Sequence, residues 1–297
     1  MMSFVKLTWD DHKTAIELAE KAVAADPKNP RYHLALAQAV GREAQKASIL
    51  RQPGLALRFK RELAATLALD PKNLDAMEYS IGFDFQAPGI MGGDKAHGRA
   101  TAEQMVRIDP VRGYLQQVML ARYDKQDGRI EELLRKAVEA GPANYLAHVI
   151  LADFCVTTLK RYGEAEALAR EALHIDPGRV NAHTILAVSL IAQDRWAELD
   201  GALAQAEKDV PDNLYPYFRA GQSCLSRPNE LARGERYFRK YLTQEPEPYT
   251  PNHSQAHWRL GQTLEKEGHK PEAIAEFQAS VKLNPESRAK EDLKRLK

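Results

Sequence analysis

Apolar residues between positions 256 and 285 recur at the spacing of two short helices joined by a turn. In the first predicted helix, Leu260 and Leu264 lie four positions apart and therefore share one face. The second predicted helix presents Phe277 and ends before Pro285, because a residue that precedes a proline is disfavoured in the helical conformation. The pattern predicts a helix pair with one apolar stripe.

Two small residues in this segment indicate how the paired helices pack. Gly261 and Ala273 stand where the helices are expected to cross, since a larger side chain would hold them apart. A single pair of helices cannot cover its own apolar stripe. The pattern therefore favours a stack of similar pairs, each covering the next.

Prolines divide the whole chain at intervals of 32 to 44 residues. Most of them follow an aspartate or asparagine, and alanines recur at fixed distances before them. They predict eight units, which close at Pro27, Pro71, Pro110, Pro142, Pro177, Pro211, Pro246 and Pro285. The expected units are an incomplete first repeat at 1–29, an extended second at 30–73, a third at 74–111 with a glycine-rich loop at 86–98, further repeats at 112–143, 144–178, 179–212, 213–250 and 251–285, and a polar capping helix at 286–297.

The order of Leu260-Gly261, Ala273, Phe277 and Pro285 resembles the tetratricopeptide repeat, a motif of about 34 residues. This resemblance implies an all-α fold, a right-handed solenoid of about eight helix-turn-helix repeats in a single domain. A second likeness covers APG at 87–89, GGD at 92–94 and IDP at 108–110. It is similar to a subset of bacterial tetratricopeptide proteins of unsettled function, many of them exported to the cell envelope, and implies no assigned activity.

The first unit is shorter than the others. Asp10 or Asp11 can cap a helix that ends near Ala25, which leaves nine residues for a partner helix. Either residues 1–9 fold back as a short plug, or the chain begins late relative to a longer precursor that carried a signal peptide. As written, the chain is expected in the cytoplasm. A missing signal would place it in the periplasm or cell envelope.

Glycine and proline predict the turns of the second and third units. The second unit is expected to have a first helix at 31–49 and a turn at 53–54. In the third, Asp94 is expected to cap a helix that ends at Ile108. The glycines before Asp94 lack the Gly-Lys-Ser/Thr order of a phosphate-binding loop. We expect either an ordered loop tucked over the helices or a loop that contacts a partner.

Composition excludes several classes of function. Forty-two Lys and Arg against 41 Asp and Glu give a balanced charge, so neither nucleic acid nor an anionic membrane is an expected partner. No run of about 18 apolar residues occurs, so no membrane insertion is expected. Cys155 and Cys224 stand on separate predicted helices and are expected to be small buried hydrophobes.

The sequence gives little support for a catalytic or metal-binding function. The nine histidines form no HExxH pair, and no GxSxG elbow occurs. His253 and His257 are four positions apart and could share a helix face, but no carboxylate accompanies them at ligand spacing. We expect no enzymatic activity, no cofactor and no bound metal.

A curved stack of helix pairs offers a groove lined by the first helix of each pair. We expect a non-catalytic scaffold that binds a protein or peptide partner there, with Trp258 as the best anchor. An alternative is the helical accessory portion of a larger envelope protein or enzyme complex with a truncated N-terminus, and the apolar first end could pair with a second copy. The residues expected on the concave face are Arg112, Met119, Arg122, Asp153, Thr184, Phe218, Gln222, Trp258, Gln262 and Glu265.

Overall fold

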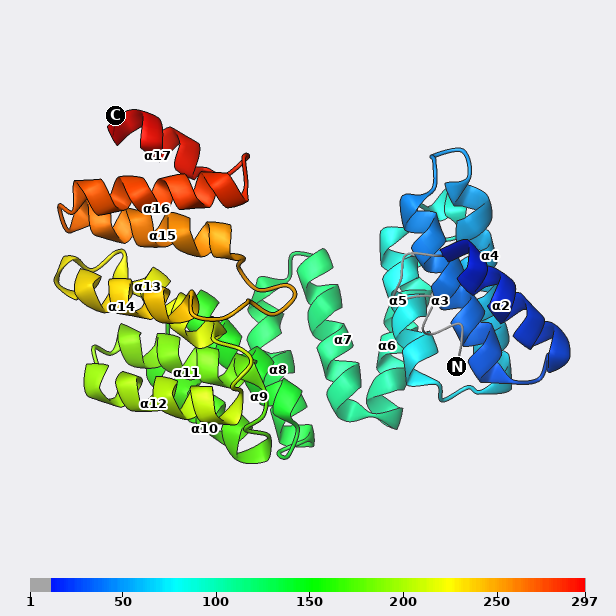
Figure 1. Ribbon diagram of the computed structural model, residues 1–297. Helices are drawn as coiled ribbons and strands as arrows, with labels where there is room; N and C mark the ends of the chain where they lie inside the picture. The colour runs from blue at the N-terminus through cyan, green and yellow to red at the C-terminus, as the bar shows by residue number, and fades with distance from the viewer. Residues whose placement is uncertain (1–11, 297) are drawn as a thin grey trace. The chain divides into compact units, whose positions relative to one another are not determined.

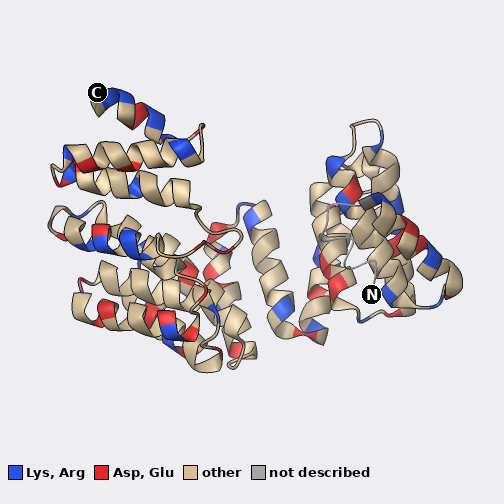
Figure 2. Ribbon diagram, viewed as in Figure 1, with Lys and Arg blue, Asp and Glu red and all other residues tan. Residues whose placement is uncertain are grey.

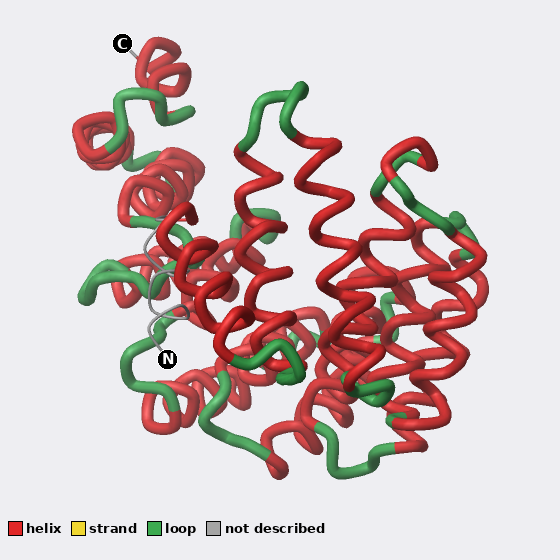
Figure 3. Tube along the Cα trace, turned by 90° about the vertical axis from the view of Figure 1, so that its right-hand side faces the viewer, coloured by secondary structure: helices red, strands yellow, loops and turns green. Residues whose placement is uncertain are grey.

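The computed structural model describes residues 12–296, and within this range every regular element is a helix (Figures 1 and 3). This confirms the all-α class predicted from the sequence. Consecutive helices lie antiparallel and pack in pairs joined by short turns, as Figure 3 shows for the trace of the chain. The predicted plug at residues 1–9 and the predicted cap at Asp10 or Asp11 lie outside the described residues.

The chain forms two compact units, and the first ends in sequence at Pro142, one of the closing prolines. The first unit contains α2 (His12–Ala25), α3 (Pro30–Lys46), α4 (Gln52–Leu69), α5 (Leu74–Gln86), a 3-10 turn (Gly89–Met91), α6 (Lys95–Ile108), α7 (Pro110–Tyr123), a 3-10 turn (Asp127–Arg129) and α8 (Ile130–Ala140).

The second unit continues the same alternation. It contains α9 (Tyr145–Phe154), a π-helical turn (Cys155–Leu159), α10 (Tyr162–Ile175), α11 (Val180–Ala192), α12 (Trp196–Asp209), α13 (Tyr215–Cys224), a 3-10 turn (Pro228–Glu230), α14 (Leu231–Tyr241), α15 (His253–Lys266), α16 (Lys270–Leu283) and α17 (Ala289–Leu296). The predicted boundary at 111/112 falls within α7, which begins at Pro110. The division into eight repeats and their union in one continuous domain stay predictions.

The Asp-Pro and Asn-Pro sequences mark the point where one helix pair ends and the next begins. At Asp70 the side chain accepts a hydrogen bond from the backbone N–H of Lys72 at 3.3 Å. Asp26, Asp176 and Asn284 make the same bond to the residue two positions on. This local turn competes with helix continuation, and the following proline cannot supply a helical N–H. A helix therefore ends at each of these sequences, and the next helix pair begins after it.

Close helix crossing explains the small residues of the repeat. A Cβ placed on Gly261 would lie 2.6 Å from Cε1 of Phe277 on the paired helix, well inside van der Waals contact. Gly221 stands in the same relation to Phe238, at 2.9 Å. Glycine at this position lets the phenylalanine ring lie directly against the backbone of the partner helix.

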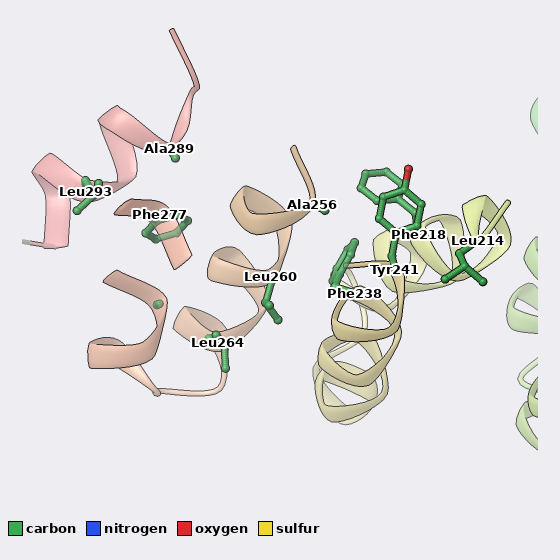
Figure 4. Close-up of a cluster of buried hydrophobic side chains, with 11 residues drawn as sticks. Leu214, Phe218, Phe238, Tyr241, Ala256, Leu260, Leu264, Phe277, Ala289 and Leu293 are labelled. Atoms are coloured by element: carbon green, nitrogen blue, oxygen red, sulfur yellow. The ribbon is translucent and has the colours of Figure 1, made fainter. Parts of the chain in front are cut away.

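The core of the second unit extends from one helix pair to the next. Figure 4 shows its apolar side chains following one another from α13 to α17. Leu293 and Ala289 of α17 cover the last helix pair, and the other face of this helix is polar, as expected for a capping element. The buried members are Leu214, Phe218, Phe238, Tyr241, Ala256, Leu260, Leu264, Ala273, Phe277, Ala289 and Leu293.

One predicted turn is misplaced. The helix expected at 31–49 ends at Lys46, and the turn to α4 occupies 47–51 instead of 53–54. Pro53 therefore lies in the first turn of α4. Proline is tolerated there because the N–H that it lacks would have no helical acceptor at a helix start. Pro53 thus marks the beginning of a helix and not a break between helices.

Candidate functional site

The glycine-rich segment between α5 and α6 is an ordered loop held by one buried carboxylate. Asp84 is 1% exposed and accepts a hydrogen bond from Nδ1 of His97 at 2.6 Å and from the backbone N–H of Asp94 at 3.3 Å. Asp94 caps α6 through the N–H groups of Ala96 and His97, and the bond from His97 holds the pKa of Asp94 below its ordinary value. The predicted cap is confirmed.

Two further contacts fix the path of this loop. A Cβ on Gly93 would lie 2.0 Å from the carbonyl oxygen of Ala87, so only glycine fits. The ammonium group of Lys60 on α4 donates to the carbonyl oxygen of Gly92 at 2.5 Å. The loop is thereby tied to the neighbouring helix pair. This arrangement agrees with the first expectation, a loop tucked over the helices.

The loop closes one side of an open pocket of about 510 Å³ in the first unit. Its wall is mainly apolar, formed by α3, α4, α5 and the loop itself, and no sequence motif pointed to it. The residues that line it are Gly41, Ala44, Gln45, Gln52, Ala56, Phe59, Glu78, Tyr79, Gly82, Phe83, Gln86, Ala87, Pro88 and Met91.

The pocket has few polar side chains, and some of them are free to hydrogen-bond to a ligand. The side-chain amides of Gln45 and Gln86 are exposed, and the structure shows no hydrogen bond to either among residues 12–296. Glu78 is occupied, because it accepts a hydrogen bond from Nε of Arg112 at 2.9 Å. An apolar wall with a few free amides suits an uncharged stretch of polypeptide.

The three predicted positions on α7 differ in their surroundings. Arg112 is half-buried and bound to Glu78 and Asp75, and these partners raise its pKa. Met119 packs against the core of the first unit, whereas Arg122 is exposed. Arg112 therefore links α7 to α5, which makes its charge less available to a partner than the sequence alone suggests.

The predicted positions on α9, α11 and α13 are split between surface and core. Asp153 is exposed. Thr184 and Phe218 are 8% and 3% exposed, so in this structure they pack inside the unit and do not lie open to a partner. Gln222 is half-buried and accepts a hydrogen bond from Arg219 at 3.1 Å. Phe218 belongs to the apolar core of the second unit and not to the expected concave face.

The three predicted positions on α15 lie near the capping helix α17. Trp258 is half-buried, and its indole Nε1 donates to Oδ2 of Asp292 at 2.8 Å. Glu265 forms an ion pair with Arg295 of α17. Gln262 accepts a hydrogen bond from Nη1 of Arg259 at 2.9 Å. The first two contacts hold the terminal helix in place.

A second pocket, of about 550 Å³, lies beside these residues. It is more polar than the first, and cations outnumber carboxylates on its wall. Both basic and acidic residues lie along α17, which contributes Arg295 to the pocket (Figure 2). The pocket is lined by Leu225, Arg259, Gln262, Glu265, Lys266 and Arg295, of which the sequence analysis named only Gln262 and Glu265.

One group of side chains in the second unit has the composition of a metal site. Oxygens of Glu235 and Glu267 and a ring nitrogen of His269 lie within 4.8 Å of one another. Glu235 is also bound to Arg239 at 2.8 Å, which competes with a cation. Exposed acidic groups are common in proteins without a bound ion.

His253 and His257, the two histidines four positions apart, hydrogen-bond to different residues. Nε2 of His253 hydrogen-bonds the carbonyl oxygen of Gln244 at 2.8 Å, and Nδ1 of His257 hydrogen-bonds Glu276 at 2.6 Å. Each ring is therefore oriented by its own acceptor. The two imidazoles do not converge on one point.

The two cysteines offer no activated nucleophile. Both are buried, and burial raises the pKa of the Cys224 thiol to about 12. A thiol of this kind stays protonated near neutral pH and is poorly nucleophilic. The prediction that each is a small buried hydrophobe is confirmed.

Comparisons with known proteins identify the repeat. Residues 131–180 and 254–287 each match a family model described as tetratricopeptide repeat. These two segments are tetratricopeptide repeats. This fold serves in general as a scaffold for interactions between proteins. No curated protein matches the chain in sequence.

Solved structures share this repeat architecture at low identity. The crystal structure of yeast Tom70 covers 97% of this chain at 15% identity with a TM-score of 0.56, and the chain spans 57% of the Tom70 structure. A tetratricopeptide-repeat protein from Parabacteroides merdae covers 88% of this chain at 12% identity, with 98% of its own length matched and a TM-score of 0.51. PilW, a type IV pilus biogenesis factor, covers 74% at 16% identity, with 97% of its own length matched and a TM-score of 0.51. These similarities support the helical repeat fold.

No helix within residues 12–296 combines the length and the apolar character needed to cross a lipid bilayer.

Proposed function

We propose that this tetratricopeptide-repeat protein is a non-catalytic scaffold that binds a segment of a partner protein along the first helices of its pairs. The observation that carries the proposal is the apolar pocket of about 510 Å³ between α3, α4, α5 and the glycine-rich loop. Helical repeat proteins bind extended or helical peptides in hydrophobic grooves of this kind, with side-chain amides fixing the peptide backbone.

Exposed apolar residues lie close in sequence to residues of the same pocket. Ile49 and Leu50, in the turn before α4, are 81% and 94% exposed, and Ile90 in the loop is 92% exposed. In sequence they lie within three positions of the pocket-lining residues Gln52 and Met91. Large exposed aliphatic side chains are typical of an interaction surface. A partner that covered them would remove apolar area from water.

Gly82 offers a way to test this surface without disturbing the fold. It lies on α5 and lines the pocket, and the only atom within 4 Å of a Cβ at this position is Nε2 of Gln86, at 3.9 Å. Gly82→Phe should therefore fill the pocket while improving the helix, because glycine is a poor helix former. Gly201→Phe is the matched control, since Gly201 is exposed on α12 with open space around its Cα.

The experiment is a selection from a random peptide library on the purified chain, followed by affinity measurements with the selected peptides. We expect peptides rich in uncharged apolar residues, whose affinity falls at least about tenfold in Gly82→Phe and is unchanged in Gly201→Phe. Selection of no peptide, or of peptides that bind Gly82→Phe as tightly as the natural chain, would overturn the proposal for this pocket.

A further inference from the structure

Arg259 is a half-buried guanidinium without a carboxylate partner. It stacks on the ring of Trp258, with 4.2 Å between Cζ and the ring centroid, and donates to Gln262. Within residues 12–296, no Asp or Glu oxygen lies within ion-pair distance of its nitrogens. Burial, and then the charge of Arg288, lower the pKa of Arg259 from its ordinary value. Its positive charge is therefore poorly compensated within the chain.

The acidic groups around Arg259 are committed to other donors. Oδ2 of Asp292 accepts a hydrogen bond from the Trp258 indole at 2.8 Å, and its Oδ1 accepts one from Arg295 at 2.9 Å. Both carboxylate oxygens of Glu265 are also bound to Arg295. A charge removed from water without a partner is costly, and an incoming anion would lower that cost.

The pocket of about 550 Å³ gives an anion access to this guanidinium. Arg259, Lys266 and Arg295 line it, against the single carboxylate of Glu265. Lys266 donates to the carbonyl oxygen of Leu225 at 2.7 Å, so its ammonium group is held at the wall of the pocket. These cations create a positive potential in a partly enclosed space, where electrostatic attraction is stronger than in open water.

The preceding helix pair repeats the same arrangement. The sequence FRAGQ of α13 corresponds to WRLGQ of α15, and Arg219 donates from Nη1 to Gln222 at 3.1 Å as Arg259 does to Gln262. Arg219 is also half-buried and has no ion-pair partner in the described part of the chain. Two successive first helices thus present an arginine oriented by a glutamine but not neutralised.

We propose that this surface binds an acidic segment of a partner protein, with Arg259 contacting one carboxylate side chain in the pocket and Arg219 contacting another on the neighbouring helix. The inference rests on the proposed scaffold function and gives the chemistry of the bound segment in the second unit. A guanidinium presents parallel N–H groups to a carboxylate, and such charged pairs are stronger than neutral hydrogen bonds. Gln262 holds the guanidinium in one orientation, which reduces the entropy lost on binding.

The test uses the full chain and three fluorescently labelled peptides of equal length, with Glu, Gln or Lys alternating with Ser. Fluorescence anisotropy at low salt should show binding of the Glu peptide, at least about tenfold weaker binding of the Gln peptide, and no binding of the Lys peptide. Added salt should weaken the Glu complex, because the attraction is electrostatic.

Substitutions locate the binding site. Arg259→Gln should lower the affinity for the Glu peptide about tenfold. Arg259→Lys should lower this affinity less because the charge remains, and Arg219→Gln should lower it a few-fold. Arg236→Gln is the control, since Arg236 is exposed on α14 and already paired with Asp200. Thermal melts establish that each variant is folded. Arg259→Lys keeps the test valid if Arg259→Gln is unfolded.

Equal binding of the Glu and Gln peptides, absence of binding to either, or an unchanged affinity in both Arg259 variants would overturn the acidic-segment inference. Failure of the acidic-segment inference is distinguishable from failure of the scaffold proposal. If only the acidic-segment inference fails, library peptides that depend on the pocket near Gly82 are still selected. If the scaffold proposal fails, neither the library nor the Gly82→Phe comparison yields a specific peptide.

Discussion

The indole nitrogen of Trp258 donates a hydrogen bond to Asp292 at 2.8 Å, and this bond joins α15 to the C-terminal helix α17. Trp258 is thus a contact for the capping helix as well as a neighbour of Arg259. Leu293, on the same helix, is buried against the core. A residue that the sequence placed in the binding groove contributes to closing the end of the stack.

Asp292→Ala should loosen α17. The substitution removes the acceptor of Trp258 and of Arg295, each bond being worth about 1 kcal/mol, and more where charge is involved. We expect the free energy of unfolding to fall by about 1–2 kcal/mol in urea titrations, with increased hydrogen exchange in the backbone of α17. Glu291→Ala, at an exposed position of the same helix, is the control. Equal stability of the two variants would show that the indole bond contributes little.

Gly261→Ala should destabilise the last helix pair, although alanine is the better helix former. The added methyl group would lie 2.6 Å from the Phe277 ring, so the ring or the helix must move. Overpacking of this size costs about 1–3 kcal/mol. Gly201→Ala meets no atom within 4 Å and should raise stability by up to about 1 kcal/mol. Thermal unfolding of both variants checks the opposite signs, and stabilisation by Gly261→Ala would contradict the crossing argument.

The repeat was predictable because its sequence patterns are local and recur several times along the chain. Leu260, Gly261 and Phe277 obey helical periodicity, and each Asp-Pro step ends a helix through bonds to its nearest neighbours. The cap at Asp94 is local in the same sense. Such features depend on a few consecutive residues, so the sequence is enough to predict them.

The candidate sites were harder to predict because they depend on residues far apart in sequence. Asp84 fixes the loop through His97, thirteen positions on, and Lys60 reaches Gly92 across 32 positions. No spacing rule indicates such contacts. Phe218 illustrates a different difficulty, because one helical residue can face either the groove or the next pair, and a shift of one position along the helix decides which.

Asp84→Ala should release the glycine-rich loop. The buried carboxylate binds the N–H of Asp94 and the ring of His97, and removal of hydrogen bonds to a charged group costs about 1.5–3 kcal/mol each. We expect a lower free energy of unfolding and faster hydrogen exchange at residues 87–94. Peptides that bind the neighbouring pocket should also lose affinity, because Ala87, Pro88 and Met91 form its wall.

Asp75→Ala is the control for this loop variant, since Asp75 is exposed and lies on the same helix. Among residues 12–296 its carboxylate binds only the outer nitrogen of Arg112. Unchanged exchange of the loop in Asp84→Ala would show that Lys60 and the backbone suffice to hold it.

Glu267→Gln should stabilise the protein at neutral pH. The carboxylate of Glu267 is 12% exposed, and its Oε2 is buried without a hydrogen-bond donor in the described residues. Burial, and then the charge of Glu235, raise the pKa of Glu267. Between the ordinary and the raised pKa the folded state holds a proton that the unfolded state has released, and ionisation above the raised pKa is unfavourable to folding.

The sign of this effect fixes its pH dependence. Below the ordinary glutamate pKa of about 4.3 the carboxyl group is protonated in both states, so wild type and Glu267→Gln should be equally stable. As the pH rises through the raised pKa, only the wild type loses stability, and the difference in melting temperature should grow and then level off. Glu247→Gln, at an exposed position in the same unit, should show no such difference. A wild type more stable than Glu267→Gln at neutral pH would mean that Glu267 is ionised and compensated, as it would be by a cation held with Glu235 and His269.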